Sequence, residues 1–151
     1  MKKAYHLGRV MEVAAWFLML ADLGLMIGLP WITETLTSQP RGGNLYMQYL
    51  VFLYVTGLVA ELILWQCRGI MRNVTQKAPF CADTVKRLRK IGWIAVTLAV
   101  VWIVLVLCFD VFKFLMAFLA LLFAFIGLVL FVFAELFKQA TAYKEENDMT
   151  I

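Results

Sequence analysis

FKFLMAFLALLFAFIGLVLFVFAELF, residues 112–137, is the stretch that decides the fold of this chain. It has no charged residue between Lys113 and Glu135, and it lacks the alternation that a half-exposed strand needs. An α-helix needs about 20 apolar residues to cross the roughly 30 Å hydrocarbon layer of a bilayer. Because lipid cannot satisfy unpaired peptide groups, we predict that this stretch is a transmembrane helix.

Three further stretches meet the same length test, namely residues 10–29, 45–65 and 91–109. They explain why 64% of the 151 residues are hydrophobic and only 16% are charged, a composition far from that of soluble domains. The hydrophilic segments between them are too short for a separate soluble domain. We therefore predict one all-α domain over residues 1–151, an integral membrane four-helix bundle.

The positively charged residues are unevenly distributed along the chain. Of its 14 Lys and Arg residues, only Arg41 and Lys113 fall in the loops after the first and third spans. The others lie in the amino-terminal segment, the middle loop and the carboxyl-terminal tail. Because basic loops stay on the cytoplasmic side, both termini and the middle loop are predicted to be cytoplasmic. We expect a multi-pass protein of the cell (inner) membrane.

An acidic residue inside a spanning helix requires a structural or functional explanation, because inserting it near the bilayer centre costs about 2.5–3.5 kcal/mol of free energy. Counted by depth, Glu12, Glu61 and Glu135 share one level near the cytoplasmic edge. We predict that neighbouring basic residues join these three glutamates in one ion-pair network. The alternative for the same level is a cation or proton site.

Asp22 stands apart from the three glutamates. It lies roughly 20 Å into the first span, counted at about 1.5 Å per residue. No Lys or Arg of another span lies at that depth. Its carboxyl group is expected either to bond Thr56, Thr97 or a backbone carbonyl, or to line a polar cavity.

Small residues recur along the fourth span at intervals of three, four, three and seven positions: Ala117, Ala120, Ala124, Gly127 and Ala134. In lipid, small side chains let two helix backbones approach closely, so the spacing predicts a packing seam. The seam faces either another helix of the same chain or a second copy, in which case the protein is a homo-oligomer.

PFCADTVKRLRKIGW, residues 79–93, leads from a turn into the third span. Residues 83–93 are predicted to form an amphipathic helix whose basic positions are Lys86, Arg87, Arg89 and Lys90. A basic amphipathic segment beside a membrane contacts anionic headgroups, at about 1 kcal/mol per basic residue. Nucleic acid is an unsuitable partner, because the run is short and has no aromatic stacking platform.

The carboxyl-terminal tail, residues 138–151, is acidic but ends in partly apolar residues. Its acidic positions include Glu145, Glu146 and Asp148. Opposite charges on the same side of the membrane attract, so we predict that the tail folds back onto residues 83–93. Met149 and Ile151 would then be buried against the apolar face of that helix, and a soluble protein would recognise this surface or compete for it.

Nothing in the sequence predicts catalysis or cofactor binding. The chain has no G-x-S-x-G, H-E-x-x-H or Walker glycine loop. Cys67, Cys81 and His6 lack the spacing of a zinc site, and Cys108 is expected to lie alone near the outer surface. We therefore predict no enzyme activity, no metal and no cofactor.

The motif at residues 79–92 and the ending YKEENDMTI, residues 143–151, resemble a widespread bacterial family of small four-helix membrane proteins, the domain of unknown function 2975. The family pattern is a Pro-Phe-Ser turn, an acidic residue, V-x-R-L-R-x-I-G, and a tail of the E-x-D-L-T-I type. This chain has Cys81 in place of Ser and Met149 in place of Leu. Members are often encoded beside a small helix-turn-helix regulator, so the resemblance implies a regulatory partner and no known catalysis.

Together these features predict a regulatory or sensory membrane protein whose middle loop and tail dock a soluble cytoplasmic partner. One alternative is a small cation- or proton-linked channel or transporter that uses Asp22 and the three glutamates. Another is a structural bundle that modulates lipid packing. The outer halves of the last three spans are nearly all apolar, which argues against a pore within one chain.

Overall fold

The computed structural model describes residues 2–38, 40–76, 80–109 and 113–149, with side chains from Gly8 onward and Asp148 excepted. These ranges contain four α-helices and no strand: α1 Lys2–Thr37, α2 Asn44–Thr75, α3 Ala82–Cys108 and α4 Lys113–Met149. All four are long and apolar enough to cross a membrane. The predicted all-α membrane fold is therefore confirmed.

The helices are longer than the apolar stretches that predict them. α1 has 36 residues and α4 has 37, whereas about 20 residues suffice to cross the hydrocarbon layer. The basic segment at residues 83–93 is continuous with the rest of α3, and most of the tail continues α4. Once a helix has nucleated, each further residue adds one hydrogen bond, so helix formers beside a span extend it.

Pro30 does not end the first helix, although the first span is predicted to stop at residue 29. α1 continues through this proline to Thr37. Tyr46 on α2 is a buried residue, and its hydroxyl donates a hydrogen bond to the carbonyl oxygen of Pro30 at 3.4 Å. The chain turns later, through Ser38 and Gly42, whose φ angles of 51° and 96° are both positive.

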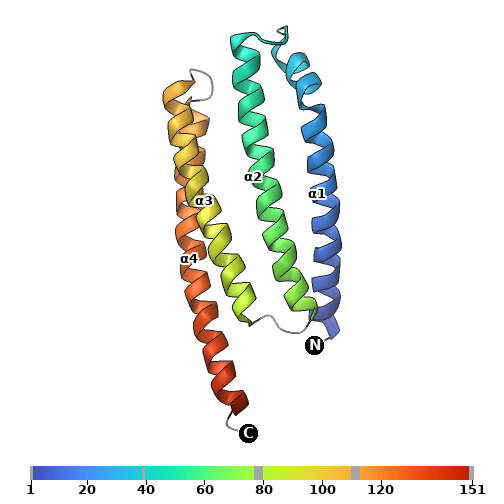
Figure 1. Ribbon diagram of the computed structural model, residues 1–151, viewed down its shortest axis with the longest axis vertical. Helices are drawn as coiled ribbons and strands as arrows, with labels where there is room; N and C mark the ends of the chain where they lie inside the picture. Colours follow the sequence, from blue (N-terminus) through green and yellow to red (C-terminus); the bar gives the residue numbers. More distant parts are fainter. Residues whose placement is uncertain (1, 39, 77–79, 110–112, 150–151) are drawn as a thin grey trace.

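The four helices form two hairpins. α1 packs along α2, and α3 packs along α4, while α2 and α3 join the hairpins (Figure 1). In the described ranges the backbone of α1 approaches neither α3 nor α4. The four helices therefore form an open bundle in chain order.

One end of the molecule holds the start of α1, the end of α2, the start of α3 and the end of α4 (Figure 1). This end carries most of the basic residues, and we name it the cytoplasmic end. The shared location of these segments agrees with four crossings of the membrane. That this end faces the cytoplasm stays a prediction from the charge distribution.

The main core lies between α3 and α4, away from the cytoplasmic end. Its buried residues are Leu98, Trp102, Met116 and Ala120. α2 contributes Phe52, whose ring centroid lies 5.1 Å from that of Trp102. The second hairpin is thus the better packed half of the protein.

The seam of small residues on α4 faces α3 along most of its length. Ala120, Gly127 and Ala134 are buried. A Cβ on Gly127 would lie 2.6 Å from the Val96 side chain and 3.1 Å from the Gly92 carbonyl oxygen. Close approach of α3 and α4 therefore accounts for these positions, and the prediction of a homo-oligomer stays untested.

Candidate functional site

The amphipathic helix at the start of α3 begins after Cys81, which has an extended backbone and makes no side-chain capping hydrogen bond to the helix. The Cys81 sulfur lies 3.3 Å from the hydroxyl of Thr84 instead. A thiol is a weaker hydrogen-bonding group than the hydroxyl that a serine supplies. The first turn of α3 therefore depends on side chains from elsewhere in the fold.

Asn73, near the end of α2, supplies the main contact. Its amide nitrogen donates hydrogen bonds to Asp83 Oδ2 at 2.9 Å and to Thr84 Oγ1 at 3.0 Å. Asn73 and Thr84 are both buried. Arg87 Nε donates to the same Asp83 oxygen at 2.7 Å. We name Gln66, Asn73, Asp83, Thr84 and Arg87 the polar node.

Arg87 turns toward α2 and is one of the predicted lipid or partner contacts that the fold uses internally. A Cβ on Gly69 would overlap the Arg87 guanidinium, so the missing side chain of this glycine leaves room for it. Arg87 Nη1 also donates to Gln66 Oε1 at 3.4 Å. Nothing in the sequence distinguishes Gly69 or Asn73, because their roles depend on which helix packs beside them.

Arg89 turns toward α4. Its Nη2 lies 3.7 Å from Glu135 Oε2, and Lys138 Nζ lies 3.2 Å from Glu135 Oε1. Residues two positions apart on an α-helix point about 200° apart, so Arg87 and Arg89 reach opposite neighbours. Lys86 and Lys90 stay exposed. The basic run thus joins three helices and still presents charge at the surface.

The structure does not join the three glutamates in one network. Glu135 is on α4 and pairs with Arg89 and Lys138. Glu12 is on α1 and Glu61 on α2, in the other hairpin. Equal depth along a helix does not fix the direction in which a side chain points, nor which helices are neighbours. That missing information explains the error.

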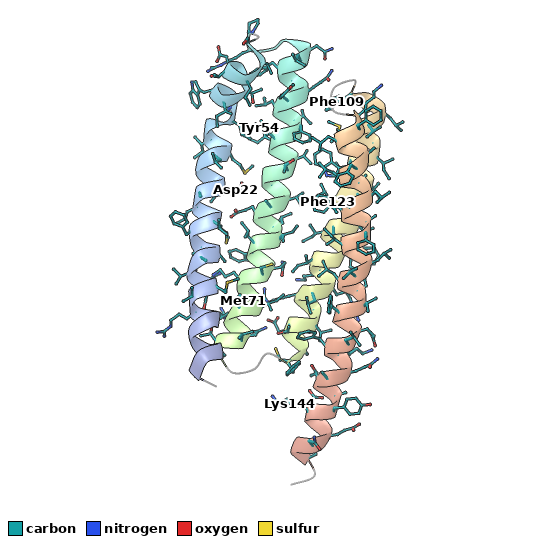
Figure 2. All side chains as sticks on the ribbon, turned by 180° about the vertical axis from the view of Figure 1, so that it is seen from behind. Asp22, Tyr54, Met71, Phe109, Phe123 and Lys144 are labelled. Atoms are coloured by element: carbon teal, nitrogen blue, oxygen red, sulfur yellow. The ribbon has the colours of Figure 1, made fainter. Side chains whose placement is uncertain are left out.

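Asp22 and Glu61 lie in the first hairpin, and each has one carboxylate oxygen that is buried. Neither Asp22 Oδ2 nor Glu61 Oε2 has a hydrogen-bond partner among the described residues. A Cβ on Gly57 would lie 3.6 Å from Asp22 Oδ1, so Asp22 faces α2 one turn from Glu61. Figure 2 shows Asp22 on the side of α1 that is turned to α2.

Asp22 lines a cavity of about 320 Å³ between α1 and α2. Its walls are mainly apolar, in contrast to the polar cavity that was one of the two expectations. Thr56 also lines the cavity, but its hydroxyl donates to the Phe52 carbonyl at 2.8 Å. Thr97 is on α3, whose backbone does not approach α1.

Arg68 ties the first hairpin together closer to the cytoplasmic end. Its guanidinium carbon lies 4.2 Å from the ring centroid of Trp16 on α1 and 5.6 Å from that of Trp65. Cation–π contacts of this kind are worth about 0.5–2 kcal/mol, depending on how well they are shielded from water. The sequence gives no sign of this pairing.

The tail does not fold back onto α3. α4 continues as a helix to Met149, and it projects beyond the other helices at the cytoplasmic end (Figure 1). Met149 is 81% exposed. Residues 138–149 hold no Gly or Pro and several strong helix formers, which explains the straight extension. Ile151 and the side chain of Asp148 lie outside the described residues.

The extension keeps part of the predicted charge contact. Glu145 lines a depression between α3 and α4 together with Lys86 and Arg89. Glu146 is exposed. Phe80 packs on Phe137, with ring centroids 5.4 Å apart. Residues 137–145 of α4 therefore lie beside the start of α3, and only the last residues of the helix project beyond it.

No group of three or more His, Cys, Asp or Glu side chains within the described ranges could hold a metal ion. The cysteines Cys67, Cys81 and Cys108 are all free. Geometry thus gives two candidate sites, the cytoplasmic end and the cavity beside Asp22.

Comparison with known sequences gives a family. The model of the family described as protein of unknown function (DUF2975) matches residues 10–151. The chain belongs to this family. The uncharacterized membrane protein YoaS of Bacillus subtilis (strain 168) is 27% identical over an alignment of 149 residues, and the match covers 84% of this chain and 92% of that protein. No solved structure matches the chain.

In this DUF2975 protein the motif that carries the resemblance is a structural junction. Val85 and Ile91 are buried, Arg87 contacts α2, and Arg89 contacts α4. Gly92 lets α4 approach, since a Cβ there would lie 3.1 Å from the Phe131 ring. The motif therefore joins the two hairpins at the cytoplasmic end.

Proposed function

We propose that this membrane protein is a regulatory or sensory protein whose cytoplasmic end binds a soluble protein partner. The observation that carries the proposal is the extension of α4, residues 138–149. The helix of 37 residues is about 55 Å long, well beyond the roughly 30 Å hydrocarbon layer. Its last turns therefore stand in water if Phe137 marks the edge of the membrane.

The extension exposes side chains that are suited to a protein interface. Tyr143 is 70% exposed and Met149 is 81% exposed. Tyr and Met are enriched at protein–protein interfaces relative to the rest of the surface. Figure 2 shows Lys144 on the same projecting segment. This combination supports contact with a protein.

The depression beside the extension supports a partner with acidic side chains. Lys86, Arg89 and Lys138 line it, against one acidic residue, Glu145. A positive site of this kind steers and orients a negatively charged partner. The family resemblance implies the partner class, a small helix-turn-helix regulator. Release or capture of such a regulator at the membrane would change its access to DNA.

Two negative predictions belong to the same proposal: the chain is not an enzyme, and it does not bind nucleic acid directly. Arg87 is turned inward to the polar node and Arg89 contacts Glu135. Phosphate binding requires several accessible cations, each adding to the salt dependence. The exposed Lys86 and Lys90 are better placed for anionic lipid headgroups.

The test uses the full-length protein in nanodiscs and a small helix-turn-helix regulator of the class that members of the family are often encoded beside. We expect direct binding, and a loss of about tenfold or more in affinity for a chain that ends after Gln139, because anchor side chains dominate interface energy. The double charge reversal Lys86→Glu/Lys138→Glu, in the depression beside the extension, should also weaken binding of an acidic partner. Lys113→Glu, at the opposite end of the molecule, is the control for it. Equal affinity of the wild type and the shortened chain would refute the proposal.

Cation- or proton-linked transport is a second candidate function, and one specific observation favours it. Asp22 and Glu61 each bury a carboxylate oxygen without a partner among the described residues. Intramembrane acids of this kind often lie on ion pathways. Ion flux into proteoliposomes that is abolished by Asp22→Asn would favour transport over docking.

A further inference from the structure

The cavity between α1 and α2 has the chemistry of a binding site. α1 contributes Asp22, Leu25, Met26, Leu29, Ile32 and Leu36, and α2 contributes Leu53, Thr56, Gly57 and Ala60. Asp22 is the sole charged side chain among these ten. A volume of about 320 Å³ is within the range of about 300–1,000 Å³ that small-molecule sites occupy. The site is thus an apolar pocket with one carboxyl group.

The carboxyl group of Asp22 has an unfilled bonding capacity. Its Oδ2 is buried and has no hydrogen-bond partner in the described part of the chain. The other polar side chain of the pocket, Thr56, donates its hydroxyl hydrogen to a backbone carbonyl. An acidic group at this depth is costly unless something in the pocket compensates it.

The chemistry of the residues that line the cavity determines which class of cation it can bind. A small inorganic cation such as Ca²⁺ or Mg²⁺ needs about six or more oxygen ligands. This pocket offers a carboxyl group and one hydroxyl, and the rest of its lining is aliphatic or glycine, apart from Met26. A cation whose charge is surrounded by apolar groups needs no such ligand shell and gains from burial against these walls.

Two charged side chains of α2, Glu61 and Arg68, lie toward the cytoplasmic end from the cavity. Glu61 adds a second negative group one turn from Gly57. Arg68 is nearer to the cytoplasmic end and stacks on Trp16. Neither lines the cavity. The charge within the pocket is therefore set by Asp22, with Glu61 reinforcing it.

From this geometry we propose that the cavity binds a lipophilic organic cation, with the Asp22 carboxylate as its counter-ion. This inference is independent of partner docking at the cytoplasmic end. It also goes beyond the alternative of ion transport, because it names the class of ligand that the site beside Asp22 binds. A lipid acyl chain is the competing occupant of the cavity, but it carries no charge that could pair with the carboxylate.

Binding of tetraphenylphosphonium to the full-length protein in zwitterionic nanodiscs tests the inference. Empty nanodiscs of the same lipid correct for partitioning, and tetraphenylborate, of the same shape and opposite charge, is the matched ligand. We expect saturable binding of the cation alone. Asp22→Asn should weaken it about tenfold or more, because Asn keeps the shape and removes the charge.

Two further variants separate charge at the pocket from general effects. Glu12→Gln removes a carboxylate from the same helix outside the cavity, and it should leave the affinity unchanged. Ala60→Leu keeps Asp22 but fills part of the pocket, and it should weaken binding of the cation about tenfold. Saturable binding that both ions share, binding that Asp22→Asn leaves intact, or no saturable binding of the cation would each overturn the inference.

Discussion

Single residues at the cytoplasmic end explain why the two hairpins hold together. Asn73 donates to two acceptors on α3, and Arg87 reaches past Gly69 to the surface of α2. A buried polar group that loses its partner costs more than the bond is worth in the intact fold. The polar node is therefore a sensitive point, although its residues are polar and lie near the edge of the membrane.

Replacing Asn73 by Ala should destabilise the detergent-solubilised protein by about 1–3 kcal/mol, because the buried Thr84 hydroxyl keeps only its weak contact with the Cys81 sulfur and Asp83 loses one bond. Thermal unfolding followed by circular dichroism measures the change. The matched control is Gln139→Ala, at an exposed position of α4. Equal stability of the two variants would show that the node contributes nothing.

Gly69→Ala tests the position of Arg87. The added methyl group overlaps the guanidinium, which must swing away from α2 and lose its bond to Gln66. We expect Arg87 to become accessible to a reagent that modifies arginine, with little change in helix content. An Arg87 that stays protected in this variant would contradict its placement against α2.

At the scale of elements, the helices of the second hairpin approach each other closely where Gly92 of α3 meets Gly127 of α4. Gly127→Leu inserts a side chain where even a Cβ would lie 2.6 Å from Val96. Overpacking of this kind costs about 1–3 kcal/mol, and more where backbone must move. Leu128→Ala, one position along and exposed, is the control for a change in side-chain size. If Gly127→Leu is as stable as wild type, α3 and α4 do not touch there.

The elements also show what the sequence could predict. Four spans follow from apolar length, since only a helix satisfies its own peptide groups in lipid. The ends of the helices do not follow, because Pro30 is tolerated inside α1 and the polar residues after Phe137 continue α4. The partner of each carboxylate depends on which helices are neighbours, and depth alone cannot give it. Glu135 with Arg89 is the plainest case.

For the whole molecule, the two hairpins predict weak coupling between their acidic residues. Glu135→Gln loses exposed ion pairs and should cost no more than about 1 kcal/mol. Glu61→Gln removes a partly buried carboxylate whose Oε2 has no partner among the described residues, so it should not destabilise. In the double variant the two effects should add to within about 0.5 kcal/mol. A larger coupling energy, measured by chemical unfolding, would show that Glu61 and Glu135 do belong to one ion-pair network and would contradict the separation of the two hairpins.

The orientation of the whole molecule decides whether the α4 extension can meet a soluble regulator. A reporter that is active only in the cytoplasm, fused after Ile151, measures this directly, and a second fusion within the α1–α2 turn, after Gly42, is its internal control. We predict an active reporter at Ile151 and a silent one at Gly42. A silent reporter at Ile151 with an active one at Gly42 would place the extension outside the cell and contradict the proposed function.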